Sequence, residues 1–130
     1  MPFRYAEARN IVFPKSAVRD RLLFTEKRTM KAIRIHNSGG PEVLHYEDAP
    51  RPQPQAGEVL VRVHAAGVNP IDWKVREGHM KDFWPHKFPL ILGWDLSGVV
   101  EEVGPRVSQF KKGDEVYSLP DPTRNGAYAD

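Results

Sequence analysis

From residue 30 onward the chain consists of short segments of alternating apolar and polar residues, interrupted repeatedly by glycine or proline. Residues 31–36 and 58–66 alternate as strands with one buried face require. The glycine-rich turn at 37–41 leads into 43–47, which predicts a β-hairpin at the start of a domain. Residues 49–57 contain three prolines, which lack the amide donor of a ladder, so this segment is expected to connect strands.

One short helix is predicted after the second of these strands. Asn69 suits a helix N-cap, Pro70 suits the first turn, and Gly78 suits the end. The pattern therefore predicts about two helical turns, followed by a loop over 79–90 rich in aromatic, proline and basic residues.

The remaining signals again indicate strands. They are expected at 96–103, at 115–119 after the turn 112–114, and at 127–129 after Asn125-Gly126. Many short strands with one or two short helices predict a mainly β fold, an irregular and partly open β-barrel.

Composition limits the classes of function. The 130 residues are enough for one domain, and no apolar run approaches the ~20 residues that cross a bilayer. There is no cysteine, and the five histidines show no ligand spacing, so neither a disulfide nor a zinc site is expected. Without basic clusters interleaved with aromatics in 30–130, neither nucleic-acid binding nor membrane binding is expected.

The first 29 residues differ from the rest. They carry a net charge of +4, whereas residues 30–130 carry −2. The segment has no secretory-signal core, and its acids are unusual in an organelle transit peptide. We interpret residues 1–29 as a disordered extension or as sequence upstream of a start at Met30. We expect a cytoplasmic protein, and organelle import by the basic leader is the alternative.

Residues 30–130 also carry, in collinear order, several motifs of a known superfamily. They are Ala66-Gly67-Val68-Asn69-Pro70-Ile71-Asp72-Trp73-Lys74, 88–100, Val103-Gly104, 112–117 and Gly126-Ala127-Tyr128-Ala129. The chain resembles the medium-chain dehydrogenase/reductase superfamily, and its zinc-independent quinone oxidoreductase and enone or enoyl reductase branch in particular. The resemblance implies that 30–130 form the GroES-like catalytic domain. The Rossmann domain of this superfamily, which holds NADPH, is absent from the chain.

Two departures from the superfamily pattern bear on the chemistry. The resemblance implies a zinc-ligand Cys at the position of Asn69 and a His-Glu pair at the position of Trp94-Asp95 in zinc-dependent members. Neither the indole N–H nor the carboxamide is a good ligand for zinc. A mechanism with NADPH and without zinc is therefore expected.

The same resemblance supplies the candidate site residues. Lys74 and Asn69 are candidates for catalysis, and Asn69, Asp72 and Lys74 are candidates for cofactor binding. Each has a structural alternative: an exposed lysine, a helix cap for Asn69, and a loop anchor for Asp72. Trp94 is a candidate wall of the substrate pocket or a core aromatic.

These observations lead to two hypotheses of different class. In the first, the chain is the catalytic-domain portion of an NADPH-dependent oxidoreductase that reduces quinones or α,β-unsaturated carbonyls, inactive on its own. In the second, it is a non-enzymatic GroES-like binding or assembly module, or an inactive remnant. A chain with unpaired strand edges is also expected to self-associate, so a homo-oligomer is possible.

Overall fold

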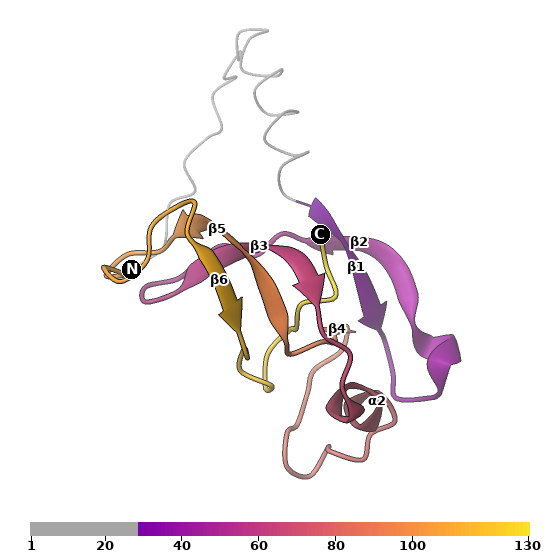
Figure 1. Ribbon diagram of the computed structural model, residues 1–130. Coiled ribbons are helices and arrows are strands. Elements are labelled where there is room, and N and C mark those ends of the chain that lie inside the picture. Colours follow the sequence, from indigo (N-terminus) through magenta and orange to yellow (C-terminus); the bar gives the residue numbers. More distant parts are fainter. Residues whose placement is uncertain (1–28) are drawn as a thin grey trace, which may run out of the picture.

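The computed structural model describes residues 29–130 as strands with one α-helix and one 3-10 turn (Figure 1). The elements in chain order are β1 Thr29–Ile35, η1 Pro41–Val43, β2 His45–Pro50, β3 Val59–Ala66, α2 Pro70–Arg76, β4 Leu90–Ile91, β5 Leu96–Val103 and β6 Glu115–Ser118. The predicted extension at 1–29 lies outside the described residues, apart from Thr29, which begins β1.

The strands form two three-stranded antiparallel sheets, which lie side by side in Figure 1. One sheet has the order β2-β1-β4, and its β1–β2 pair is the predicted hairpin, with Ile33 opposite Tyr46. The other has the order β3-β5-β6, with Val63 opposite Gly98 and irregularities in register on both sides of this pair. The mainly β architecture predicted from the alternating pattern is confirmed.

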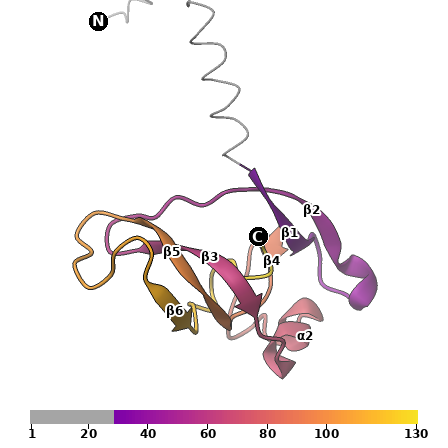
Figure 2. The ribbon, with the colours of Figure 1, turned by 45° about the horizontal axis from the view of Figure 1, so that its top comes forward.

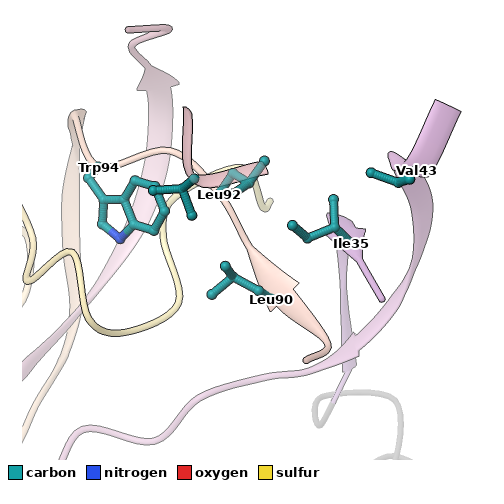
Figure 3. Close-up of a cluster of buried hydrophobic side chains, with 6 residues drawn as sticks. Ile35, Val43, Leu90, Leu92 and Trp94 are labelled. Atoms are coloured by element: carbon teal, nitrogen blue, oxygen red, sulfur yellow. The ribbon is translucent and has the colours of Figure 1, made fainter. Parts of the chain in front are cut away.

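The core lies around β1, β4 and the residues that follow β4. Its main cluster consists of buried side chains from β1, η1, α2 and the 90–94 segment: Ile35, Val43, Val75, Leu90, Leu92 and Trp94. Figure 3 shows Trp94 and Val43 at opposite ends of this cluster. A second cluster of Ala32, Ala49 and Ile91 adjoins β1, and Tyr128 packs against both clusters.

The helix α2 follows β3 at one end of the molecule (Figures 1 and 2). Asn69 is its N-cap in extended conformation, Pro70 is its first residue, and Gly78 closes the turn with φ +81°. Val75 enters the core while Trp73 and Lys74 are exposed. The short helix was predicted at this place, and it sets the backbone of the candidate site.

Two predicted boundaries were wrong. The segment 127–129 is not a strand of a ladder, since it makes a single bridge between Ala129 and Ala32. In addition, β2 continues through Ala49 to Pro50. Proline is tolerated there because it is the last residue of an edge strand. The pattern also missed β4, whose two residues are too few for alternation to be seen.

Among residues 29–130, no helix is long and apolar enough to cross a membrane.

Candidate active site

The candidate site is built around the N-terminal turn of α2. Asp72 is 4% exposed and is the one buried charged side chain in the described part of the chain. Its Oδ2 accepts a hydrogen bond of 2.6 Å from the backbone N–H of Asn69, which satisfies a donor at the helix start. The loop-anchoring interpretation of Asp72 is consistent with this geometry.

Asn69 connects the helix to the start of β5. Its side-chain Nδ2 donates a hydrogen bond to the Asp95 carboxylate. A backbone hydrogen bond joins the same two segments, because the Gly67 N–H donates to the Asp95 carbonyl oxygen over 2.8 Å. Two residues that are 26 positions apart are thus held against each other, and Asn69 lies between two carboxylates.

Tyr128 closes this arrangement from the C-terminal segment. Its hydroxyl lies 2.9 Å from Asp72 Oδ2, to which it donates, and 3.2 Å from the carbonyl oxygen of Gly67. Burial, followed by the hydrogen bond and charge of Asp72 and the charge of Asp95, raises the pKa of Tyr128 above its ordinary value. The phenol therefore stays protonated and acts as a donor.

One oxygen of the buried carboxylate remains unused. Within residues 29–130, Asp72 Oδ1 has no hydrogen-bond partner, although Oδ2 has two donors. A buried acceptor without a donor costs about 1–3 kcal/mol, so this oxygen favours a donor, either a water molecule or a group of a ligand.

Lys74 lies on the same helix but is not a member of this hydrogen-bond network. It is exposed, and its ammonium lies 5.7 Å from the centre of the Trp73 ring. This geometry leaves a positive charge free to approach an anionic group from the solvent side of α2. Its predicted roles in catalysis and cofactor binding stay predictions.

Trp94 is placed in the core. Its side chain is 2% exposed, its indole N–H donates to the Arg124 carbonyl oxygen over 3.1 Å, and its ring lies 5.8 Å from that of His86. In this chain the ring is covered by protein, as the core-aromatic interpretation expects. Its role as a pocket wall stays a prediction.

Asp95, Tyr128 and the Gly67 carbonyl were missed as parts of the site. The sequence did carry a signal, since all three belong to the motifs that gave the superfamily resemblance. Spacing could not assign them, because Tyr128 lies 56 residues from Asp72 and only the fold brings them together.

The donor set can be tested against a zinc ion. In the described residues, no three His, Cys, Asp or Glu side chains gather as metal ligands. Asn69 and Trp94 stand at two ligand positions of zinc-dependent members. The Asn69 amide donates to the Asp95 carboxylate, and the Trp94 indole N–H donates to the Arg124 carbonyl oxygen. These residues do not fit zinc.

The comparison with protein families agrees with the fold. Residues 55–129 match the alcohol dehydrogenase GroES-like domain. The chain belongs to this domain family, and with it to the medium-chain dehydrogenase/reductase superfamily.

Within that superfamily the similar proteins include quinone oxidoreductases. The pig quinone oxidoreductase is 43% identical over 109 residues, which cover 82% of this chain and 31% of that protein. The quinone oxidoreductase of Coxiella burnetii superposes with a TM-score of 0.69 at 37% identity, covering 78% of this chain and 33% of that one. A mycobacterial protein solved in complex with NADPH superposes with a TM-score of 0.66 at 42% identity, covering 77% and 28%. The chain spans about a third of the length of the curated relatives it matches.

Proposed function

We propose that this chain is the catalytic-domain portion of an NADPH-dependent, zinc-independent oxidoreductase that reduces quinones or α,β-unsaturated carbonyls. The similarity to quinone oxidoreductases, extending over four fifths of the chain, supports the substrate class. The observation that carries the zinc-independent part is the engagement of Asn69 by Asp95 at a position where zinc-dependent members have a ligand.

The residues of α2 fit a bound dinucleotide in two ways. Asn69 and Asp72 lie in one turn, and the buried Asp72 Oδ1 is an acceptor that still lacks a donor, which suits a hydrogen-bonding group of a ligand. Lys74 offers an exposed positive charge on the same helix. NADPH, when bound, supplies the hydride.

In place of zinc, the proposed chemistry needs a positive group near the oxygen on which negative charge develops. We assign this role to the Lys74 ammonium, which can stabilise that oxygen electrostatically or orient the cofactor. A quinone is fully reduced once the phenolate oxygen left by hydride transfer has accepted a proton, whereas the enolate from an α,β-unsaturated carbonyl must accept its proton at the α-carbon. A lysine ammonium can serve as the proton donor.

A chimera tests the proposal. Residues 30–130 are joined to the part of the pig quinone oxidoreductase that follows its N-terminal third, and oxidation of NADPH by a quinone is measured. Activity above that of the pig remainder alone is expected, and an inactive but folded chimera that binds NADPH would contradict the proposal. NADPH titration of the 130-residue chain shows separately whether this domain holds any of the cofactor site.

The same chimera tests Lys74. Lys74→Met should lower kcat by about 100-fold if the ammonium stabilises developing charge. Lys112→Met, which removes an exposed lysine from the turn before β6, is the control and should leave kcat unchanged. Equal kinetics for the two variants would remove Lys74 from the mechanism.

A further inference from the structure

We propose that Tyr128 is a positioning residue of this site, whose hydroxyl fixes the Asp72 carboxylate and, through it, the turn that carries Asn69. The inference rests on the proposed function, because it assigns a further residue to the same site. In this role the phenol ring packs in the core, and the hydroxyl orients Asp72.

The ring and backbone of Tyr128 are held independently of its hydroxyl. The Tyr128 N–H donates to the Leu92 carbonyl oxygen over 3.0 Å, and the Ile33 N–H donates to the Tyr128 carbonyl oxygen over 2.8 Å. The ring lies against Gly93 so closely that a Cβ on that residue would be 2.4 Å from ring carbons. Since the residue is fixed at its backbone and along its ring, the direction of the hydroxyl is set by the core.

The hydroxyl in turn determines how Asp72 is oriented. Together with the Asn69 N–H it places two donors on Oδ2, and this leaves Oδ1 unpaired. Without the hydroxyl, the carboxylate keeps only the Asn69 N–H and can rotate to exchange its two oxygens. The orientation of the unpaired oxygen therefore depends on a residue outside α2.

The hydroxyl also joins the two sides of the site. It lies 3.2 Å from the carbonyl oxygen of Gly67, the residue whose N–H holds the Asp95 backbone. Asp95 accepts from the Asn69 side chain, so Asn69 is coupled to Tyr128 along two routes. Loss of the hydroxyl is expected to loosen Asn69 more than any residue of the sheets.

Hydrogen exchange in the 130-residue chain tests this directly. In Tyr128→Phe, which keeps the ring, exchange of the Asn69 backbone N–H should rise about tenfold relative to the wild type, the equivalent of about 1.4 kcal/mol, as expected for one hydrogen bond to a charged group. Amides of β3 and β5 should keep their protection. Tyr117→Phe, in which the altered side chain is 91% exposed, is the matched control and should change neither.

Three results would overturn the proposal. The first is unchanged exchange of the Asn69 N–H in Tyr128→Phe. The second is a uniform rise of exchange in all elements, and the third is a Tyr128→Phe chain that does not fold. In the last two cases the hydroxyl would contribute to stability alone.

The chimera gives a second readout. Tyr128→Phe should lower kcat about tenfold while KM for NADPH changes less than about twofold, the pattern of a lost orientation effect. An unchanged kcat in an active chimera would overturn the role in the reaction. If the wild-type chimera is inactive, the proposed function fails, while hydrogen exchange still decides whether Tyr128 positions Asp72 and Asn69.

Discussion

At the scale of single residues, the contact between Gly93 and the Tyr128 ring shows how a backbone position serves the site. Gly93 has φ +90°, a conformation that side chains disfavour, and its missing Cβ leaves the space that the ring fills. The phenol reaches Asp72 only because the ring can lie this close to the backbone after Leu92.

We therefore predict that Gly93→Ala is more destabilising than an alanine at another positive-φ glycine. Gly113 is the matched control, because its φ is +95° and no heavy atom would lie within 4 Å of a new Cβ. Gly113→Ala should cost about 1–2 kcal/mol for the backbone conformation alone. Gly93→Ala should cost a further ~1–3 kcal/mol for displacing the ring. Urea denaturation measures both, and equal losses would contradict the importance of the ring contact.

A second prediction at this scale concerns alkaline pH. The folded protein raises the pKa of Tyr128 above its ordinary value of about 10, chiefly by burial. Above pH ~10 the native state therefore binds more protons than the unfolded state, and the free energy of unfolding falls as pH rises. Below that pH Tyr128 contributes no pH dependence.

Denaturation of the wild type and Tyr128→Phe at pH 9 and pH 11 checks this. The difference in stability between them should shrink by up to about 1 kcal/mol over this range, after allowance for solvent screening of a half-buried group. Tyr117→Phe serves as the control for general effects of alkali. A constant difference between wild type and Tyr128→Phe would show that the phenol titrates alike in both states.

At the scale of elements, the pairing of β3 with β5 depends on a close approach at Gly98. A Cβ on Gly98 would lie 2.1 Å from the Arg62 carbonyl oxygen, which belongs to the backbone of β3 and cannot swing aside. Gly98 pairs with Val63 next to an irregularity in register, where glycine commonly allows strands to approach.

Gly98→Ala is accordingly expected to separate the two strands and to cost about 2–4 kcal/mol. Ser97→Ala, at the exposed neighbouring position of the same strand, should stay within about 0.5 kcal/mol of the wild type. Thermal and urea unfolding followed by circular dichroism provide the comparison. A loss at Gly98 no greater than at Ser97 would mean that the close contact is relieved at little cost.

The elements also show how far sequence alone reaches. Alternation located β1, β3 and β5, and the Asn69, Pro70 and Gly78 signals located α2, because these patterns are local. Sequence predicted a full strand at 127–129, where only the Ala129 bridge forms, and it missed the two-residue β4, because both depend on partners distant in sequence. The site divides in the same way: Asn69 and Asp72 came from one motif, whereas Asp95 and Tyr128 join them only in the folded chain.

At the scale of the whole molecule, residues 126–130 tie the core together. Gly126, Ala127 and Tyr128 donate backbone hydrogen bonds to Ile91, Gly93 and Leu92, respectively. On the other side, Ile33 donates to Tyr128, and Asp130 donates to Lys31. This segment connects β1 with the 90–94 segment and carries the phenol to α2.

Deletion of residues 126–130 should therefore abolish cooperative unfolding. Each lost hydrogen bond contributes about 1 kcal/mol, and the packed Tyr128 ring contributes about 2 kcal/mol. The sum of these losses is comparable with the ~5–15 kcal/mol that stabilises a domain. A thermal scan of the shortened chain measures this, and a synthetic peptide of residues 124–130 added in excess should restore the transition. A sharp transition of the shortened chain at the wild-type temperature would contradict the prediction.

The long separation between Tyr128 and Asp72 also orders events during translation. Asp72 is incorporated first, and Tyr128 is the 56th residue added after it. At ~5–20 residues per second this takes about 3 to 11 seconds. For that interval the nascent α2 segment has no phenol to pair with, so the complete site cannot form before residue 128 has been made.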